Sequence, residues 1–162
     1  MRILTLLLAV SLLGCANSRT QIRAEDGEQF AMYHHIGILP FSDTRGQGAK
    51  LADSLSDALA KQRFNETVDR SLLEQSVKKF KVTPETGIGV EALEEIRGKT
   101  AADAILFGKM TPDWSAARVV VLETEMGGAV LSALVRPKGR EKVFANADEV
   151  STEIMRAFSR VK

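Results

Sequence analysis

The stretch Ala104-Ile105-Leu106-Phe107-Gly108-Lys109-Met110 is apolar at both alternations of a β-strand over most of its length. Successive side chains of a strand point to opposite faces of the sheet, so a strand that is apolar on both faces is covered on both. We therefore predict a central strand here, with packed layers above and below it.

Strands and helices alternate on both sides of this stretch. Apolar residues at helical spacing, with charges between them, indicate a helix at 49–63, and β-branched residues downstream indicate a hairpin. Pro40 ends the first strand, and Asn146 caps the last helix. Asp69 and Ser71 can both satisfy the free amides at the start of the second helix, where Ser71 and Glu74 have the spacing of a capping box. We expect strands at 35–41, 64–68, 104–110, 118–125 and 129–136, and helices at 49–63, 69–80, from 90 to about Gly98, and at 147–160.

This order predicts an α/β fold in which a mixed sheet of about five strands is flanked by helices, a three-layer-like sandwich. Once residues 1–14 are removed, 148 of the 162 residues remain, which is enough for one domain with a sizeable core. We place that domain at 32–162. An architecture of this kind does not indicate a function by itself.

The first fifteen residues have the pattern of an export signal. Arg2 supplies a positive charge, Ile3–Leu13 form an apolar run shorter than the ~20 residues of a membrane-spanning helix, and Cys15 follows a glycine. The end of the run, Leu12-Leu13-Gly14-Cys15, resembles the lipobox of bacterial lipoproteins, which implies acylation of Cys15 and removal of residues 1–14. Several acyl chains hold a protein firmly on a bilayer. The alternative is an ordinary secretory signal in which Cys15 has no special role.

Between this anchor and the domain, we predict a lipidated cysteine and a flexible tether at 15–31. Residues 16–29 are polar and without periodicity, and fully extended they would reach about 45 to 50 Å. The lipobox resemblance also implies a sorting rule, under which Ala16 favours the outer membrane because an aspartate there would retain the protein in the inner membrane. We therefore expect a domain that faces the periplasm.

Composition excludes some classes of partner. The 22 Lys and Arg nearly balance the 21 Asp and Glu, so no net field draws the chain to nucleic acid. Cys15 is the only cysteine, so its acylation would leave no thiol for a disulfide. The fold must then be stable through its core alone.

Three segments carry a family resemblance: Ile36–Phe41, Thr67–Glu74 and Thr100–Gly108, in this order and at this spacing. They resemble a superfamily of bacterial envelope proteins that includes the curli-secretion channel lipoprotein CsgG, the amino-terminal domain of TolB, and lipoprotein activators of penicillin-binding proteins. The resemblance extends from about His35 to Arg136 and implies the α/β fold of that superfamily.

The pore of the secretion channel is not expected to carry over. That family member builds its pore from long transmembrane hairpins, and a membrane strand needs ~9 to 11 residues with alternating faces. Here Arg118–Glu125 has only a short β-branched run that ends in Glu123 and Glu125. We predict a hairpin that does not enter a membrane.

Candidate catalytic motifs are weak throughout the chain. Gly46-Gln47-Gly48 precedes a helix as a phosphate-binding loop does, but Leu51 stands where the third glycine of that motif belongs. His34 and His35 are neighbours in a strand and point to opposite faces, so they cannot readily bind one metal ion. Glu94 and Glu95 lie on a polar helical face. We predict no enzyme, catalytic residue, metal, cofactor or small-molecule substrate.

Arg70 and Trp114 are the candidate partner contacts. A cation beside a helix start is not favoured by the helix dipole, so Arg70 either forms a salt bridge with Asp43 or Asp69, the reading we favour, or binds a partner. Trp114 either covers an edge of the core, which is commoner, or is an exposed anchor. The basic run at 136–142 is read as a solvated turn, with contact to anionic lipid as the alternative.

We thus expect an outer-membrane-anchored periplasmic lipoprotein that acts as a non-enzymatic binding or assembly module for another envelope protein. One alternative is an oligomeric component of a secretion or export apparatus, which the channel resemblance implies. A weaker one is an activator of a peptidoglycan synthase. The expected contacts are therefore the membrane, through the N-terminal lipid, and either another envelope protein or a second copy of the chain.

Overall fold

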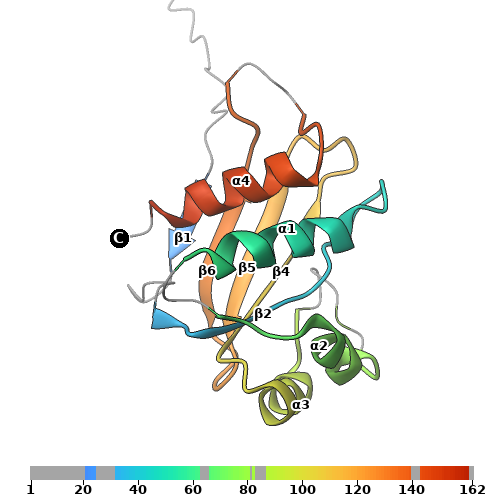
Figure 1. Cartoon of the computed structure of the whole chain (residues 1–162), viewed down its shortest axis with the longest axis vertical. Helices are drawn as coiled ribbons and strands as arrows, with labels where there is room; N and C mark the ends of the chain where they lie inside the picture. Colours follow the sequence, from blue (N-terminus) through green and yellow to red (C-terminus); the bar gives the residue numbers. More distant parts are fainter. Residues whose placement is uncertain are drawn as a thin grey trace, which may run out of the picture.

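The computed structural model of the chain describes residues 32–62, 66–80, 82, 87–139 and 143–160, together with the backbone of 21–24. In this part of the chain, one sheet has the strand order β1-β6-β5-β4-β2-β3 (Figure 1). Its strands are β1 (Gln21–Ala24), β2 (His35–Ile38), β3 (Glu66–Thr67), β4 (Ala104–Met110), β5 (Ala117–Glu123) and β6 (Ala129–Val135). The helices are α1 (Gly48–Ala60), α2 (Arg70–Val77), α3 (Val90–Thr100) and α4 (Ala147–Phe158). The predicted α/β class and mixed sheet are confirmed.

The sheet has a parallel half and an antiparallel half. β2 pairs in parallel with both β3 and β4, while β4, β5 and β6 form an antiparallel meander to which β1 adds at the far edge. The strand that the sequence places at the centre, β4, lies between these halves, and every residue of it except Lys109 is buried. The prediction of a strand covered on both faces is confirmed.

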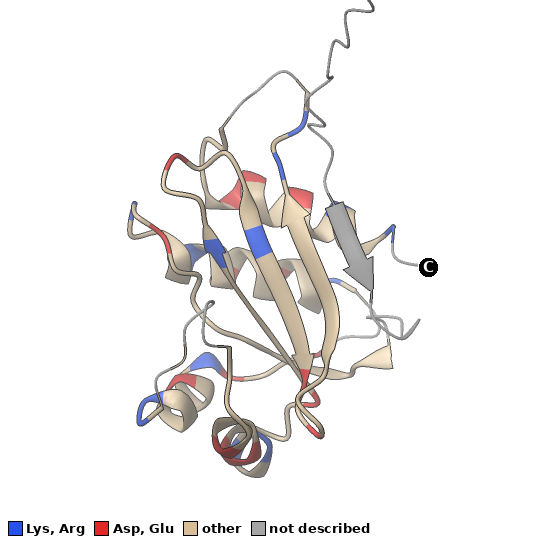
Figure 2. Ribbon diagram, turned by 180° about the vertical axis from the view of Figure 1, so that it is seen from behind, with Lys and Arg blue, Asp and Glu red and all other residues tan. Residues whose placement is uncertain are grey.

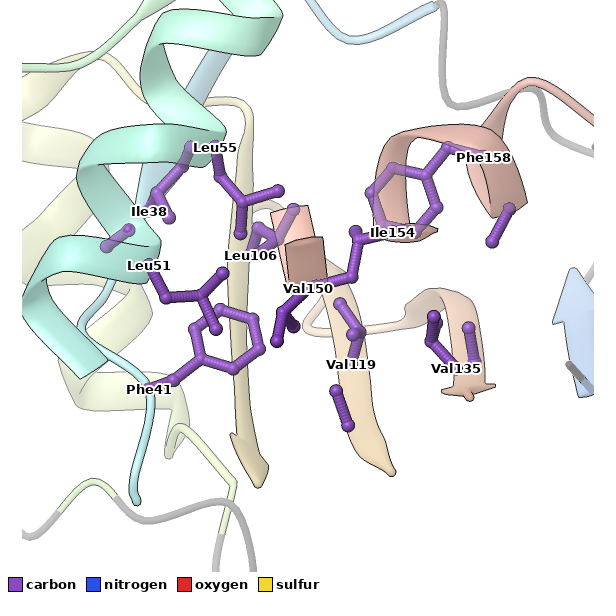
Figure 3. Close-up of a cluster of buried hydrophobic side chains, with 14 of the residues drawn as sticks. Ile38, Phe41, Leu51, Leu55, Leu106, Val119, Val135, Val150, Ile154 and Phe158 are labelled. Atoms are coloured by element: carbon purple, nitrogen blue, oxygen red, sulfur yellow. The ribbon is translucent and has the colours of Figure 1, made fainter. Parts of the chain in front are cut away.

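Two apolar clusters account for this burial. On one face α1 and α4 lie side by side across the sheet and form the larger cluster, in which Leu55, Leu106 and Ile154 are fully buried (Figure 3). On the other face α2 and α3 cover Ile105 and Phe107. Adjacent residues of β4 therefore belong to different clusters, as the period of two in a strand requires.

The second face is covered only in part. Along β5, Ala117, Val119 and Val121 are buried under α1 and α4, while Arg118 is exposed and Val120 is half-buried. Figure 2 shows this face from behind, with α2 and α3 at its lower end and no helix over the rest of the meander. We call the outward side of β4, β5 and β6 at their upper end in this view the open face.

Two details of the helix ends differ from the sequence prediction. Asp69, and not Ser71, caps α2, because its side chain accepts a hydrogen bond from the backbone N–H of Leu72 at 3.1 Å. The predicted capping box at Ser71 and Glu74 is wrong. Helix α3 continues past Gly98 to Thr100 and ends at Ala101, whose φ of 53° places it in the left-handed region.

Two glycines are required by close packing of the backbone. A Cβ at Gly108 of β4 would lie 2.2 Å from the carbonyl oxygen of Arg118 on β5 and 2.6 Å from the ring of Phe41. A Cβ at Gly48, the first residue of α1, would lie 1.7 Å from the carbonyl oxygen of Phe41. Any side chain at these two positions would therefore separate strands or helix from sheet.

Part of the segment predicted to be a tether is paired with the sheet. Gln21–Ala24 form β1, antiparallel to β6, with Gln21 opposite Leu134 and Ala24 opposite Leu131. The signal sequence, Cys15 and the rest of the predicted tether lie outside the described residues. None of the helices in the described part of the chain has both the length and the apolar character needed to span a bilayer.

Candidate interaction surfaces

The loop before α1 is occupied by a carboxylate of the chain itself. Asp43 accepts hydrogen bonds from the backbone N–H groups of Arg45 at 2.6 Å, Gln47 at 3.2 Å and Gly48 at 2.7 Å. These are the free amide groups that would otherwise attract an anion to the start of a helix. The phosphate-loop alternative is therefore not supported at Gly46–Gly48, because an internal anion fills the position.

Trp114 belongs to the core and not to an exposed surface. Its side chain is only 1% exposed, and its φ of 63° turns the chain between β4 and β5. The guanidinium of Arg45 lies over the indole ring, 4.5 Å from its centroid, and the backbone N–H of Phe144 donates to the Trp114 carbonyl at 2.8 Å. Of the two readings of Trp114, the structure favours the core edge, and an exposed anchor is excluded in this arrangement.

The turn that holds Trp114 also carries a strongly acidic carboxyl group. The backbone N–H of Ser115, followed by the hydroxyls of Thr111 and Ser115, lowers the pKa of Asp113 from 3.8 to about 2. The amide and hydroxyl of Ser115 donate to Oδ1 of Asp113 at 3.0 and 2.8 Å. Asp113 is therefore ionised at any physiological pH.

Arg70 forms a salt bridge, but with a different partner from those expected. Its guanidinium pairs with Asp53 of α1 and also donates to the carbonyl oxygen of Ala49 at 3.1 Å. The predicted pairing with Asp43 or Asp69 is wrong, because Asp43 accepts from the amides of Arg45, Gln47 and Gly48, and Asp69 caps α2. The Arg70 side chain is 22% exposed and joins the starts of two helices, which favours the structural reading of this residue over partner contact.

The two histidines do not share a site. The backbone N–H groups of His34 and His35 donate to the carboxylate of Asp103 at 2.8 and 3.0 Å, which fastens the start of β2 beside β4. The imidazole of His35 lies 3.6 Å from the carboxylate of Glu66 on β3. Within the described ranges, no group of three or more His, Cys, Asp or Glu is arranged to hold a metal ion.

The apolar residues on and beside α2 and α3 include two exposed side chains. Leu72 of α2 is 47% exposed and Val90 at the start of α3 is 67% exposed. Next to Val90 lies a groove of about 440 Å³ lined by Phe80, Val82 and the first turn of α3. We call Leu72, Val90 and this groove the α2–α3 surface. The sequence does not predict this surface, since an apolar residue at a helix start gives no signal of its exposure.

A second apolar cleft lies between α2 and the sheet. It has a volume of about 180 Å³ and is lined mainly by apolar side chains, with Glu74 as its one ionisable group. Its lining residues are Leu39, Pro40, Glu74, Val77, Val82, Phe107 and Gly108. Val82 lines both hollows, so the cleft and the α2–α3 surface adjoin.

On the open face, two cations lie directly opposite each other on neighbouring strands. Lys109 of β4 lies opposite Arg118 of β5, and Arg118 lies opposite Leu134 of β6. Arg136 is the first residue after β6. In Figure 2 the blue positions of β4 and β5 stand side by side, and further blue positions follow the end of β6.

Solved structures confirm the fold. No family model and no curated protein matches the sequence. A PelC dodecamer from Paraburkholderia phytofirmans contains a chain that is similar with a TM-score of 0.53 and 14% identity, over 86% of this chain and 98% of that chain. This chain has the fold of PelC. The three segments that carry the family resemblance lie in that fold on β2, on β3 with α2, and on β4.

Two further structures are similar at lower scores. The LpoB C-terminal domain from Escherichia coli has a TM-score of 0.48 and 16% identity, over 66% of this chain and 87% of that chain. TolB from Acinetobacter baumannii has a TM-score of 0.48 and 13% identity, over 88% of this chain and 30% of that chain. The α/β fold that the family resemblance implies is present in this chain.

Proposed function

We propose that this chain is a lipoprotein anchored to the outer membrane by acylated Cys15, and that its periplasmic domain binds another envelope protein without catalysing a reaction. The observation that carries the protein-binding part is the α2–α3 surface, where Val90 exposes apolar area beside a groove and Leu72 is exposed on the neighbouring helix α2. Contiguous apolar area on a protein surface is typical of contact sites for other proteins. The lipobox resemblance supports the anchor.

Site-specific crosslinking in intact cells tests the binding surface. The buried Trp114 is unsuitable for this purpose, whereas Val90 is exposed, so a photo-crosslinking amino acid belongs at position 90. Asp57, exposed on α1 at the opposite face, is the matched control. We expect a discrete adduct with one envelope protein from position 90 and none from position 57. No adduct from position 90, or the same adduct from both positions, would reject the α2–α3 surface as the binding site.

The anchor has its own test. Intact-mass spectrometry of the protein from membranes should show a mature chain that begins at Cys15 and carries acyl chains. An unmodified terminus would reject the lipoprotein assignment while leaving the binding surface untouched.

A ring of identical subunits is the second candidate function. The PelC chain that shares this fold forms a dodecamer. Light scattering of the unlipidated chain from Ala16 to Lys162 discriminates between the two functions: a stable assembly of several copies supports an oligomeric component of a secretion apparatus, and a monomer at high concentration opposes it.

A further inference from the structure

We propose that the α2–α3 surface and the apolar cleft beside it bind a basic segment of the partner protein, in which a lysine or arginine adjoins an apolar side chain. The cation lies in the cleft with its charge at Glu74, and the apolar side chain lies in the groove beside Val90. This assignment deepens the proposed function and rests on it. Two observations lead to it: the size of the cleft, and the carboxylate at its edge.

The cleft has room for a side chain and not for a larger ligand. Its volume is about 180 Å³, whereas pockets for small-molecule ligands begin at about 300 Å³. Leu39 and Phe107 of its lining are buried, and Val77 and Val82 are half-buried. The groove of about 440 Å³ adjoins the cleft at Val82. Two adjoining hollows suit side chains that follow one another along a peptide segment better than one compact ligand.

Glu74 is the ionisable group of the cleft, and the chain supplies no cation for it. Among the residues that the structure describes, no ion pair or hydrogen bond to its carboxylate is found. It begins the last turn of α2, where the helix dipole disfavours a negative charge. It does not serve the start of α2 either, because Asp69 is the cap. Lysine and arginine combine an apolar stem for the cleft with a charged donor for this carboxylate.

The neighbouring cations do not neutralise Glu74. Lys79 donates to Glu95 at 2.6 Å. Lys109 has an interaction of its own. Lys78 is exposed, four residues after Glu74, and forms no ion pair with it in this structure; an exposed pair at that spacing would contribute little. The carboxylate is therefore available to a cation from another protein.

The groove beside Val90 has the same sign of charge. Glu91 is its one ionisable lining residue, and the exposed Glu94 follows three residues later on the same side of α3. The cations of α3, Arg97 and Lys99, lie in its last turn, at the other end of the helix. The two carboxylates attract a cationic segment and repel an acidic one, which adds specificity without fixing the position of the bound charge.

Selection from a random peptide library tests this chemistry on the purified protein. The unlipidated chain from Ala16 to Lys162, which contains every described element, is immobilised, and the phage-displayed peptides that bind it are sequenced. We expect the selected peptides to be enriched in lysine or arginine adjacent to a large apolar residue. Selected peptides without this enrichment, or no selected peptide at all, would overturn the assignment.

Glu74→Gln removes the charge in the cleft and keeps the size of the side chain. The strongest selected peptide, followed by fluorescence anisotropy, should bind this variant about tenfold more weakly, which corresponds to about 1.4 kcal/mol. Asp57→Asn, at an exposed position of α1 on the opposite face, removes the same charge and should leave the affinity unchanged. Equal weakening by both variants would indicate a general effect of charge, and no weakening by Glu74→Gln would exclude the cleft; either result rejects the assignment.

The photo-crosslink from position 90 separates this assignment from the proposed function. We expect the adduct with the envelope protein to be lost when Glu74→Lys is added to the chain and to persist with Asp57→Lys. An adduct undiminished by Glu74→Lys would keep the α2–α3 surface as a binding site and reject a basic segment as its occupant. An adduct of two copies of this chain would assign the surface to self-association and reject the segment of a separate protein. No adduct from the chain without these changes would reject the proposed function itself.

Discussion

The replacement Gly108→Ala is a stringent test of the packing between β4 and β5. The added Cβ would lie 2.2 Å from the carbonyl oxygen of Arg118, whereas a comfortable carbon-to-oxygen contact is at least about 3.3 Å, so the strands must separate by about 1 Å. Arg118 contributes a backbone atom to this contact, and rotation of a side chain cannot relieve it. Overpacking of this kind costs about 2 to 3 kcal/mol.

Gly98→Ala is the matched control, because the same replacement there is expected to stabilise the fold. Gly98 lies inside α3, and nothing lies within 4 Å of the position of an added Cβ. Alanine in a helix interior is more stable than glycine by about 0.5 to 1 kcal/mol. The two variants should therefore differ by about 3 kcal/mol, or about 6 to 12 °C in Tm for a domain of this size.

The assay is denaturant unfolding of the unlipidated chain from Ala16 to Lys162, monitored by circular dichroism. The slope of the transition should stay constant while its midpoint falls for Gly108→Ala and rises for Gly98→Ala, since a constant slope indicates an unchanged unfolding reaction. A midpoint for Gly108→Ala at or above that of the unmodified chain would refute the close approach of β4 to β5.

Three further outcomes are expected. Asp43→Ala should destabilise the fold by about 1 to 2 kcal/mol in the same assay, because three backbone amides lose their acceptor; an unchanged midpoint would contradict that role. Asp113→Asn tests linkage to pH: hydrogen bonds, chiefly from the Ser115 amide, hold the pKa of Asp113 at about 2 in the fold against 3.8 as its ordinary value. The stability this contributes is present above about pH 4 and is lost as the pH falls toward about 2, so the unmodified chain should lose more stability than the variant in that window, and parallel curves would reject the shift. A double-mutant cycle of Arg70→Ala and Asp53→Ala should give a coupling below about 1 kcal/mol, because Asp53 is 64% exposed; a much larger value would mean that the pair is screened from solvent.

The centre of the fold could be predicted because its signals are local. Strand β4 is apolar at both alternations, and α4 has a polar cap at Asn146 followed by apolar residues at helical spacing. Both features are fixed by short-range physics, namely burial on two faces and satisfaction of the first helical amides. The hairpin of β5 and β6 was predicted for the same reason.

The remaining features depend on contacts between distant segments. Gln21–Ala24 alternate polar and apolar residues over only four positions within a polar segment, which is too short a pattern to predict a strand, and they pair where β6 offers an open edge. The partner of Arg70 is Asp53, on a helix whose position relative to α2 the sequence does not specify. Asp69 and Ser71 are both good caps, and the choice between them depends on where β3 ends. The open face could not be predicted either, because alternation indicates which side chains point outward but not whether a helix covers them.

The way in which β1 joins the sheet determines how the domain bears tension. If the lipid holds the chain before Gln21 and a partner protein binds the end that carries α2 and α3, a force between the two attachment points acts parallel to the strands. The hydrogen bonds between β1 and β6, over the register from Gln21–Leu134 to Ala24–Leu131, are then loaded together in shear and do not open one after another. Two paired strands that are loaded in shear resist force far better than strands whose hydrogen bonds are broken one at a time from one end. The short strand β1 would thus act as a mechanical clamp. Separation of β1 from β6 would lengthen the chain between the lipid and the sheet by several residues at once.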